Sequence, residues 1–560
     1  MAVPLNHPRL SGDPPLLVFE DDHLLVIHKP AGWNTHSPSP YAGEGVYEWL
    51  RHREPRWSSL AIVHRLDKET SGLLVFTKTP AANKSLTEQF TAHGVRKTYS
   101  LLSHGSLSSP SVTCSQPIAR AGEKYQCDPR GQSAETRFDF RGEASLPRRQ
   151  GTGSRPFWRY EATPRTGRTH QIRAHAAALG IPIAGDLLYG GAPGPRVCLH
   201  ASRLAFTHPA SNEEIAFECP PPWLEASLLD TNAPRLDRAA LIVPAETDAY
   251  RIAHGEADHW DGSYVDRLGA HILAQTEAEL RKDQKDYLAA QLPALATDEG
   301  DSVGALYEKR LLRRIRGTAP QQVSPQRIAG NASVERFEIR ENGLRFELSF
   351  QEGYSIGIFL DQRDNRRRWK VAHVAAGFPF PLIGEPRPEL LNTFAYTCGF
   401  SVAAAAGGWR VTSLDLSRKY LEWGRRNFLL NGLKDVDHDF IYGDTFDWLR
   451  RWKKKGRQFS GIILDPPTFS ESKEEGRFQA EKDYGKLVEA ALAVLAPGGM
   501  LLASTNAARL EPEAFVDRIH QAAIHANRKI SHEHYAPQPP DFPMTREEPG
   551  YLKTLWVRVG

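Results

Sequence analysis

Short apolar runs, each closed by a polar turn, dominate the first part of the chain. Leu16–Pro30 holds two such runs around an Asp-Asp turn and ends in a Pro-Ala-Gly breaker. Runs of this length bounded by turn residues predict β-strands. Similar runs lie in Ala61–Lys78, Lys97–Leu102, Arg137–Phe140 and Leu204–Phe217. For residues 1–228 the pattern therefore predicts an α+β domain with a mixed sheet in which antiparallel strands predominate.

A second, smaller α+β domain is predicted for residues 249–350. Ala249–Gln275 is again rich in β-forming residues, whereas Glu277–Leu292 and Ala305–Arg316 space their apolar residues as helices do. Further along, Asn342-Gly343 joins two apolar runs, and Asn-Gly is a strong signal for a hairpin turn.

Strands and helices alternate from residue 351 to residue 560. The predicted strands are Glu389–Phe394, Arg410–Asp415, Phe440–Tyr442, Gly461–Leu464 and Gly499–Ser504, and the predicted helices are Ser401–Ala406, Arg418–Asn431 and Tyr484–Leu495. Such alternation predicts a parallel, doubly wound α/β sheet. Residues 229–248, which contain a polar stretch and follow a run of prolines, are predicted to be a linker. The chain is thus expected to be a multidomain protein.

Composition and charge narrow the class of protein. The 560 residues are 40% hydrophobic and 24% charged, as in ordinary globular proteins. A net charge of +3 excludes a bulk polycation, so RNA or DNA binding would require local basic faces. The five cysteines show no zinc-ligand spacing, so we expect neither a metal site nor disulfides. We find no signal peptide and no apolar stretch that reads as a membrane span, so a cytoplasmic protein is expected.

A polar loop, IVHRLDKETSG at residues 62–72, lies between two apolar segments. Polar groups held there are costly unless they are paired or used, so Asp67 marks a candidate active site. For an isolated H-x-x-D, a surface carboxylate paired with Arg65 or Lys68 is the alternative. Two further strings accompany the loop: RTGRTHQIRAH at residues 165–175 carries several cations, and RKTY at residues 96–99 adds an aromatic and a lysine.

Together these strings resemble the RluA-type pseudouridine synthases. A-x-T-x-F at residues 134–138, GDxxYG at 185–190 and LHASRLAFTHP at 199–209 also match. The resemblance implies isomerisation of uridine to pseudouridine in RNA, with no cofactor. It implies that Asp67 is the catalytic aspartate, that Arg173 pairs with it, that Tyr99 packs against the target base, and that Arg65 acts near the flipped-out nucleotide.

The chemistry suits these assignments. Breaking the glycosidic bond requires a carboxylate that acts as a nucleophile or takes a proton, and the sequence leaves both roles open. A guanidinium such as that of Arg173 would keep Asp67 ionised. The cations predicted to bind phosphates, and so to offset the cost of flipping the base, are Lys97, Arg165, Arg168 and Arg173. The histidines at 64, 170 and 175 are predicted to be hydrogen-bonded structural residues rather than acids or ligands.

A second candidate site lies in the alternating segment. Residues 391–415 lack the G-x-G-x-x-G fingerprint but gather small residues at a turn, where a backbone can approach a ligand. Asp415, Asp444 and Asp465 each follow a predicted strand, and doubly wound sheets bind ligands at the carboxyl ends of their strands. For the turn alone, an ordinary packing helix with a capping aspartate is the alternative.

From about residue 250 to residue 559 the chain resembles the SAM-dependent 23S rRNA methyltransferases of the RlmI and RlmK type. The matching strings include YRIAHGEADHWDGSYVDRLG, GIFLDQRDNR, LNTFAYTCGFSVAAA, YGDTFDWL and LDPPTFS. The resemblance implies a Rossmann-like class I methyltransferase domain at 351–560 behind an RNA-binding-like domain at 249–350. It implies that SAM is held by Gln362, Arg363, Asn392, Phe394, Tyr396, Gly399, Asp415, Asp444 and Asp465, and that Asp465, Pro466 and Pro467 border the target base.

The cysteines bear on which atom is methylated. Cytosine C5 methylation requires a thiolate that attacks the ring, but Cys398 is the only cysteine after Cys219 and lies in the cofactor turn. Guanine N7 already carries a lone pair and needs mainly positioning. N7-guanine is therefore favoured, also because DPPTFS is closer to the N7-guanine relatives. An exocyclic amine is the alternative, since D-P-P resembles the motif of amino-methylases.

Taken together, the sequence predicts a bifunctional enzyme whose partner is RNA, either 23S rRNA or a ribosomal precursor. An RNA-binding assembly factor with one inactive domain is the alternative from another class. A dinucleotide-dependent oxidoreductase is disfavoured by the missing glycine fingerprint. Basic stretches at Lys309–Arg316, Arg363–Lys370 and Arg451–Arg457 are either solvated faces or tracks for an RNA backbone. The sequence gives no oligomeric state.

Overall fold

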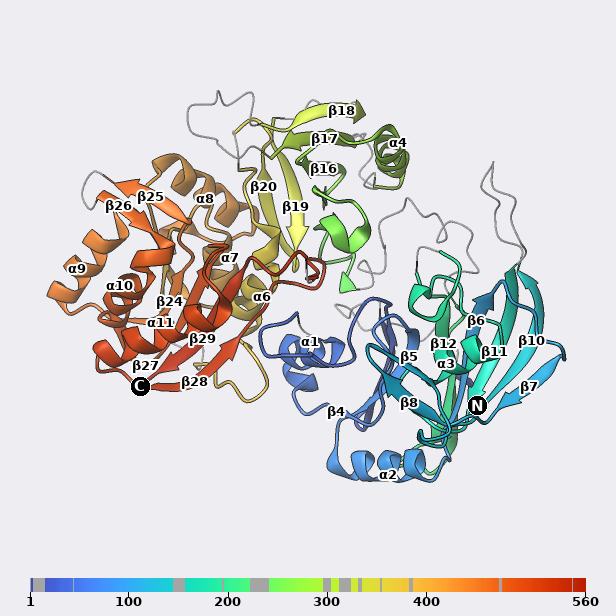
Figure 1. Ribbon diagram of the computed structural model, residues 1–560. Helices are drawn as coiled ribbons and strands as arrows, with labels where there is room; N and C mark the ends of the chain where they lie inside the picture. The colour runs from blue at the N-terminus through green and yellow to red at the C-terminus, as the bar shows by residue number, and fades with distance from the viewer. Residues whose placement is uncertain are drawn as a thin grey trace. The chain divides into compact units, whose positions relative to one another are not determined.

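The computed structural model describes residues 2–3, 16–43, 45–144, 157–193, 196–221, 241–295, 304–311, 324–330, 335–352, 355–381, 386–472, 476–545 and 547–560. Packing divides the chain into two compact units (Figure 1). The N-terminal unit comprises Met1–Pro38, Gly45–Trp49 and Ser59–Val243, and the C-terminal unit comprises Ser39–Glu44, Leu50–Ser58 and Pro244–Gly560. Most of the predicted linker at 229–248 lies outside the described residues, so its structure is not tested.

The N-terminal unit is built on one mixed sheet, as predicted. Its main path is β2-β3-β5-β12-β6-β11-β10-β7, in which β5 and β12 pair in parallel and the other neighbours pair antiparallel. These strands are β2 (Leu17–Glu20), β3 (Leu24–Lys29), β5 (Ser71–Thr77), β12 (Leu199–Thr207), β6 (Arg96–Ser103), β11 (Phe157–Pro164), β10 (Thr136–Ala144) and β7 (Ser111–Cys114). At its edges lie β1 (Ala2–Val3), β4 (Ala61–Ile62) and β13 (Glu214–Glu218).

Two helices and a ribbon accompany this sheet. Helix α2 (Pro80–Thr91) begins after Thr79, whose hydroxyl caps the Ala82 amide, and buries Ala82 and Leu86 against the sheet. The other elements are α3 (Gln171–Ala178) and the β8–β9 ribbon (Ile118–Ala121 and Lys124–Cys127). Helix α1 (Val46–Arg53) is divided between the two units, with its residues up to Trp49 in the N-terminal one.

One glycine sets how closely the two parallel strands approach. Gly72, at the start of β5, has φ +119°, and a Cβ there would lie 2.4 Å from the Ala201 carbonyl oxygen on β12. Only glycine fits this backbone and this spacing. The loop that ends at β5 carries Asp67, so this close strand contact fixes the base of that loop.

The first part of the C-terminal unit is a five-stranded sheet in the order β14-β15-β16-β17-β18. The strands are β14 (Ala249–His254), β15 (Ser263–Leu268), β16 (His271–Thr276), β17 (Ala305–Arg310) and β18 (Gln326–Gly330), with α4 (Lys282–Gln291) alongside. The helix predicted at Ala305–Arg316 is wrong for Ala305–Arg310. That segment is β17, because it pairs with β16 and β18 and is buried on both faces. Pairing and burial in a central strand override local spacing.

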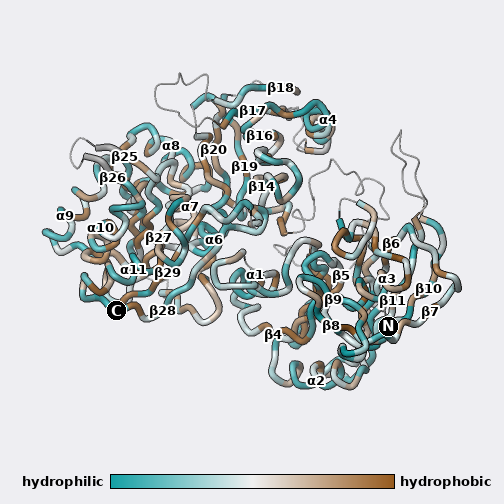
Figure 2. The backbone as a smooth tube through the Cα atoms, in the orientation of Figure 1, coloured by the Kyte–Doolittle hydropathy of each residue, from teal (hydrophilic) through white to brown (hydrophobic). Residues whose placement is uncertain are grey.

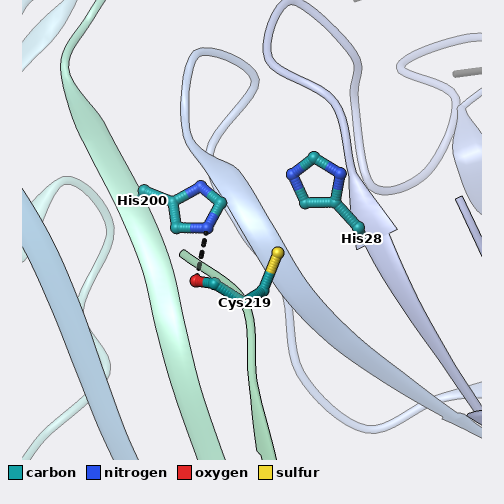
Figure 3. Close-up of side chains that lie close together, drawn as sticks. All are labelled: His28, His200 and Cys219. Carbon is teal, nitrogen blue, oxygen red and sulfur yellow. Dashed lines mark hydrogen bonds between the residues drawn. The ribbon is translucent and has the colours of Figure 1, made fainter. Parts of the chain in front are cut away.

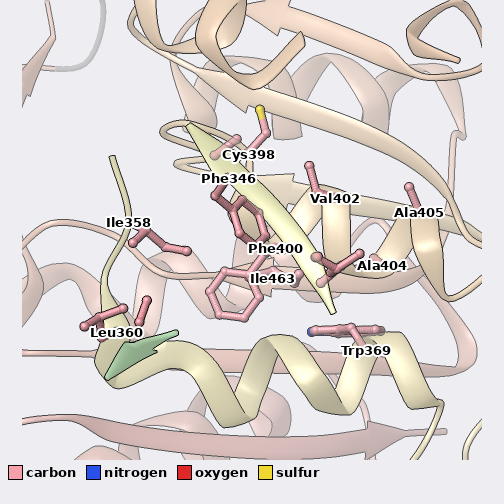
Figure 4. Close-up of a cluster of buried hydrophobic side chains, with 14 of the residues drawn as sticks. Phe346, Ile358, Leu360, Trp369, Cys398, Phe400, Val402, Ala404, Ala405 and Ile463 are labelled. Carbon is pink, nitrogen blue, oxygen red and sulfur yellow. The ribbon is translucent and has the colours of Figure 1, made fainter. Parts of the chain in front are cut away.

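The predicted hairpin follows as β19 (Phe337–Glu341) and β20 (Leu344–Leu348). Asn342 and Gly343 both have positive φ, +52° and +73°, as a tight hairpin turn requires. The hairpin does not form a core of its own. Phe346 of β20 packs with Trp369 and Phe400 from the following segment in one hydrophobic cluster (Figure 4). The predicted domains 249–350 and 351–560 therefore share a core.

The second part of the C-terminal unit is the predicted doubly wound α/β sheet, in the order β23-β22-β21-β24-β27-β29-β28. The first five strands are parallel, and β29 and β28 add antiparallel pairs. The strands are β21 (Glu389–Thr393), β22 (Arg410–Asp415), β23 (Asp439–Tyr442), β24 (Phe459–Leu464), β27 (Leu495–Thr505), β28 (Ile530–Tyr535) and β29 (Lys553–Val559), with a small β25–β26 ribbon (Phe469–Ser472 and Gly476–Gln479).

Helices cover both faces of this sheet. One hydrophobic cluster joins it to α6 (Arg363–Val371), α7 (Gly399–Ala406) and α8 (Arg418–Leu430). Another joins it to α9 (Thr445–Lys455), α10 (Ala480–Leu492) and α11 (Pro512–His525). Figure 2 shows the outer helix α9 as hydrophilic and the strands of the sheet as more apolar. No helix among the described residues is both long enough and apolar enough to cross a membrane.

The basic stretch Arg363–Lys370 is neither a solvated face nor a track for RNA. It forms α6, and its arginines are buried. Arg366 pairs with Glu341 through two hydrogen bonds of 2.6 and 2.7 Å, and Arg363 pairs with Asp541. Buried guanidinium groups require such partners, and these partners come from distant parts of the chain. In the stretch at 451–457, Arg451 and the following lysines on α9 are exposed, whereas most of 309–316 lies outside the described residues.

Candidate active sites

A cavity of about 810 Å³ opens in the N-terminal unit around the polar loop between β4 and β5. The loop contributes Arg65 and Asp67, and β6 contributes Lys97 and Tyr99. The segment before α3 completes the wall. The predicted site residues that line this one cavity are Arg65, Asp67, Lys97, Tyr99, Arg165 and Arg168. Asp67 is half-buried, whereas Arg65, Arg165 and Arg168 are exposed.

The cavity wall combines a neutral aromatic with cations. Tyr99 is 8% exposed, and burial together with the negative charge of Asp67 raises the pKa of its hydroxyl, so it stays neutral. Burial lowers the pKa of Lys97, whose ammonium lies 5.6 Å from the centre of the Phe90 ring. This wall suits a planar, uncharged base beside a negatively charged backbone.

Arg173 does not pair with Asp67, which corrects the prediction. Its Nε and Nη2 donate to the two carboxylate oxygens of Asp186 at 2.7 and 2.8 Å, and its guanidinium lies 4.9 Å from the Tyr189 ring centre. Asp186 is 1% exposed, and a carboxylate so deeply buried needs a bidentate cation more than half-buried Asp67 does. The charge of Asp67 still acts on Arg173 and raises its pKa.

Asp186 and Tyr189 are site residues that sequence reasoning left without a role. The Tyr189 hydroxyl bonds His170 Nδ1 at 2.9 Å, and His170 is a wall residue of the cavity. Asp186 and Tyr189 both belong to the sequence motif GDLLYG at residues 185–190. The motif could have marked these two residues as functional, but only the fold shows that it lies beside α3.

The three histidines predicted to be structural are hydrogen-bonded. His64 accepts the Val75 amide proton at Nε2 (3.1 Å), and both ring nitrogens of His175 have partners, Thr136 Oγ1 (3.0 Å) and the Gln116 carbonyl (2.9 Å). Burial, and then the charge of Lys97, lower the pKa of His64 to about 3, so it is neutral near pH 7.

Tertiary structure also gathers side chains that are scattered in the sequence. The ligand-type atoms of His28, His200 and Cys219 lie within 4.8 Å of one another (Figure 3). His200 Nδ1 bonds the Ser71 hydroxyl at 2.8 Å, and Nε2 bonds the Cys219 carbonyl at 3.1 Å. Because both ring nitrogens are used, His200 links β12 to β5 and to the end of β13.

In the C-terminal unit the three predicted aspartates lie at carboxyl ends of parallel strands. Asp415 ends β22, and Asp465 follows β24 directly. Asp444 comes after β23 and caps α9 by accepting the Asp447 amide proton at 3.1 Å. Strand β21 lies between β22 and β24, so the strand order changes direction at β21. In doubly wound sheets, ligands bind at the carboxyl ends of the strands at such a switch point.

The turn after β21 is strained and is held by Asp415. Phe394, Tyr396 and Cys398 have φ of +54°, +50° and +63°, a conformation that costs a non-glycine residue about 1 kcal/mol or more. Asp415 accepts the Tyr396 and Ser417 amide protons, each at 2.8 Å, on different oxygens. Each oxygen keeps a second lone pair, which fits two neighbouring hydroxyl groups such as those of a ribose. Burial raises the pKa of Asp415.

The remaining predicted cofactor residues divide into two groups. Gln362 reaches Asp465, and Gly399 opens α7 beside the strained turn. By contrast, Asn392 Nδ2 donates a hydrogen bond to Ser401 Oγ at 2.8 Å. The buried guanidinium of Arg363 donates from Nη1 to Asp541 Oδ2, also at 2.8 Å. These last two side chains already have partners within the chain, and the contact with SAM expected for them stays a prediction.

Asp465 is the most perturbed carboxyl group of this crevice. Burial and the charge of Asp361 raise its pKa to about 7, although hydrogen bonds from Ser504 and Gln362 oppose the rise. Pro466, which follows it, is buried, whereas Pro467 is exposed. The motif therefore presents a carboxyl group that titrates near neutral pH at the edge of the sheet.

Known proteins match the same two regions. Residues 23–178 match the model of RNA pseudouridylate synthases, and residues 292–558 match that of S-adenosylmethionine-dependent methyltransferases. A ribosomal RNA large subunit methyltransferase of Deinococcus radiodurans is 34% identical over 352 residues, which cover 58% of this chain and 78% of that protein. The chain belongs to the ribosomal RNA large subunit methyltransferases.

This methyltransferase carries an RNA pseudouridylate synthase domain in front of its SAM-dependent domain. Two solved structures are similar to it. A putative SAM-dependent methyltransferase from Streptococcus mutans is 27% identical, with a TM-score of 0.45, and covers 56% of this chain and 76% of its own. Human RNA pseudouridylate synthase domain containing 1 is 26% identical, with a TM-score of 0.32, and covers 39% of this chain and 86% of its own.

Proposed function

We propose that this protein is a bifunctional enzyme that modifies 23S rRNA or a ribosomal precursor, isomerising a uridine and methylating a guanine at N7. The observation that supports the first activity is the cavity that holds Asp67, Tyr99 and Lys97 together. Because the two domains are on one chain, binding of an RNA by one domain raises the effective concentration of the other domain near that RNA.

In the synthase domain the target uridine is flipped out of its stack into the cavity. Tyr99 packs against the base, while Arg65, Arg165 and Arg168 bind phosphates at the mouth. Asp67 then reacts at the sugar, either as a nucleophile or by taking a proton. Arg173 and Asp186 hold α3, which forms part of the wall, and so act as positioning residues.

In the methyltransferase domain the chain holds SAM, which supplies the methyl group when bound. Asp415 binds the ribose hydroxyls, Asp444 lies by the adenine, and the turn from Phe394 to Gly399 contacts the methionine part. The two free lone pairs of Asp415 and the strained turn beside it support this assignment. Asp465, Pro466 and Pro467 border the target base.

The acceptor is guanine N7 in this proposal. Cytosine C5 chemistry is disfavoured because Cys398 is buried and burial raises the pKa of its thiol to about 12, so it provides no thiolate. An exocyclic amine is the second candidate. A carboxyl group with a pKa of about 7, as Asp465 has, suits acceptance of the proton that an amine loses.

Nucleoside mass spectrometry of rRNA incubated with the purified full chain and SAM tests the proposal. Pseudouridine is expected with or without SAM, and N7-methylguanosine only with SAM. Cleavage of the RNA by borohydride and aniline would locate the methylated guanine. RNA that gains neither nucleoside would refute the proposal. A methylated exocyclic amine in place of N7-methylguanosine would show that the amine, and not guanine N7, is the methyl acceptor.

A further inference from the structure

A chain of hydrogen bonds fixes the tautomer of His170, the residue directly before α3. The Tyr125 amide on β9 donates to the Tyr189 hydroxyl oxygen at 2.9 Å, and this oxygen also lies 2.9 Å from His170 Nδ1. If Nδ1 donated as well, the proton of the buried Tyr189 hydroxyl would have no acceptor among the described residues, which is costly. Tyr189 therefore donates to Nδ1, and a neutral His170 carries its proton on Nε2.

Two tyrosine rings hold the imidazole of His170 in place. The rings of Tyr125 and Tyr189 lie edge-on to it, with centres 5.6 and 5.7 Å from its own. The backbone of His170 has φ +54°, in the left-handed region that is unfavourable for a residue other than glycine. Strain of this kind is concentrated at functional sites, where the surrounding structure maintains it.

The second ring nitrogen of His170 is open to the cavity that holds Asp67. His170 is half-buried and lines this cavity. Its Nε2 has no hydrogen-bond partner among the described residues, and the protein does not enclose it. His175 on α3 differs, because both of its ring nitrogens have partners. His170 thus presents one unused N–H donor to a ligand in the cavity.

The groups around His170 keep this donor uncharged near pH 7. Burial has the largest effect and lowers the pKa of His170. The charges of Asp67 and Asp186 raise this pKa and that of Arg173 lowers it, and the net shift is downward. Burial also raises the pKa of Tyr189, so its hydroxyl keeps the proton that it donates.

We propose that His170 is a further catalytic residue of the synthase domain, which donates a hydrogen bond from Nε2 to a carbonyl oxygen of the target uracil. Tyr189 is the positioning residue that keeps the proton on this nitrogen. The inference rests on the proposed isomerisation of a uridine in this cavity. The flipped base brings two carbonyl acceptors, O2 and O4, into a wall that offers this one neutral imidazole N–H.

The electron balance of the isomerisation gives this hydrogen bond its effect. When the bond from C1′ to N1 breaks, its electron pair stays with the uracil ring, and the negative charge spreads onto the carbonyl oxygens. Carbon C5 then forms the new bond to C1′, and the proton lost from C5 is balanced by the one gained at N1. His170 keeps its own proton throughout, and its donor stabilises the charge that develops on the oxygen, whichever role Asp67 takes.

Single-turnover formation of pseudouridine in saturating rRNA, measured with the full chain by nucleoside mass spectrometry, tests the inference. His170→Asn tolerates the left-handed backbone and still accepts from Tyr189 but has no donor at the Nε2 position, so its rate should fall about a hundredfold. His170→Gln, whose amide reaches that position, should stay within about tenfold of the wild type. The RNA concentration at half-maximal rate should change less than about twofold in both variants, because the donor acts on the base and not on the backbone.

Tyr189→Phe tests the positioning role. Without the hydroxyl, the proton of His170 is free to move to Nδ1, and the rate should fall about tenfold. In the His170→Asn background the same change should lower the rate less than about twofold, because both residues act through one hydrogen bond. A purely structural role of Tyr189 would lower the rate equally in both backgrounds and would overturn this part of the inference.

RNA that carries 2-thiouridine or 4-thiouridine identifies the oxygen, because sulfur is the weaker acceptor. One of the two RNAs should slow the wild type about tenfold relative to unmodified RNA and should not slow His170→Asn further. If each thio-substituted RNA affects the two proteins equally, His170 does not contact the base.

His23→Asn, at the turn between β2 and β3 outside the cavity, is the control and should react as the wild type does. A wild-type rate in His170→Asn would overturn this inference alone. So would a variant that only requires more RNA, since His170 would then bind a phosphate. Wild-type protein that forms no pseudouridine would overturn the proposed isomerisation, and this inference with it.

Discussion

Arg173 and Asp186 form a bidentate ion pair in which both side chains are almost completely buried. Arg173 lies on α3 and Asp186 directly before the short 3-10 helix Leu187–Tyr189, so the pair fastens one wall of the Asp67 cavity. The guanidinium that was expected to touch Asp67 therefore acts on it only through its charge.

Breaking this pair should destabilise the N-terminal unit. Asp186→Asn leaves the Arg173 guanidinium buried without a counter-charge, and we expect the free energy of unfolding of this unit to fall by about 3–5 kcal/mol. Calorimetric melts of the full chain measure the change. The matched control is Glu214→Gln, which breaks the exposed pair with Arg96 and should leave the free energy of unfolding nearly unchanged. Equal effects of the two variants would contradict the structural role given to Arg173.

Asp67→Asn should abolish pseudouridine formation, because no other carboxylate among the described cavity wall residues replaces it. Affinity for RNA should stay within about twofold, since the cations that we propose to bind phosphates remain. Nucleoside mass spectrometry and filter binding provide the two measurements. Asp139→Asn, on β10 outside the cavity, serves as the control and should isomerise normally. Isomerase activity that survives Asp67→Asn would remove the assignment.

Asp415→Ala should weaken SAM binding about tenfold to a hundredfold. The variant loses the two bonds that Asp415 accepts from the Tyr396 and Ser417 amides and also the two hydrogen bonds to ribose hydroxyls that we propose for it. Isothermal titration calorimetry with SAM and no RNA measures the affinity. Asp437 is exposed and lies after the next helix, so Asp437→Ala provides a comparison that should bind SAM as the wild type does. Unchanged affinity in Asp415→Ala would place the cofactor elsewhere.

The N-terminal unit should become less stable in mild acid because of His64. The pKa of His64 in the folded protein is about 3, below the ordinary value of 6.5. The neutral buried imidazole therefore contributes its full stability to the folded state above pH 6.5, and this contribution is lost as pH falls toward about 3. His64→Gln, which still accepts the Val75 amide proton, should reduce the loss of stability at about pH 4 by about 2 kcal/mol. Melting curves from neutral to acidic pH test this, with His93→Asn at an exposed turn as control. Parallel curves for wild type and His64→Gln would contradict it.

Local pattern was sufficient for most of the fold. The alternation from Glu389 to Ser504 gave the five parallel strands and three of the helices of the doubly wound sheet to within a few residues, because buried strands are short, largely apolar runs. Helix α9, between β23 and β24, was not predicted. Local pattern also failed at Ala305–Arg310, where apolar spacing suggested a helix. Strands β16 and β18 on either side decide that segment, and neither is visible in a local window.

Motifs located both sites but not the contacts within them. The sequence motifs around Asp67 and Lys97 predicted residues that line one cavity, because each motif can be recognised from neighbouring residues alone. The partner of Arg173 was missed because burial, which makes Asp186 demand a cation, is a property of the packed chain. The same holds for Arg363, whose partner Asp541 lies far along the sequence.

The sequence by itself determined the order of elements, the two families and the residue types at each site, because periodicity and motif spacing are local properties of the chain. Only the tertiary structure decided which charges meet. It buried Arg366 in α6 instead of exposing a basic face, and it buried Asp465 within the field of the Asp361 charge, which together raise the pKa of Asp465 to about 7. The reason is physical: desolvation and Coulomb interactions depend on distance through space, which residue numbers do not encode.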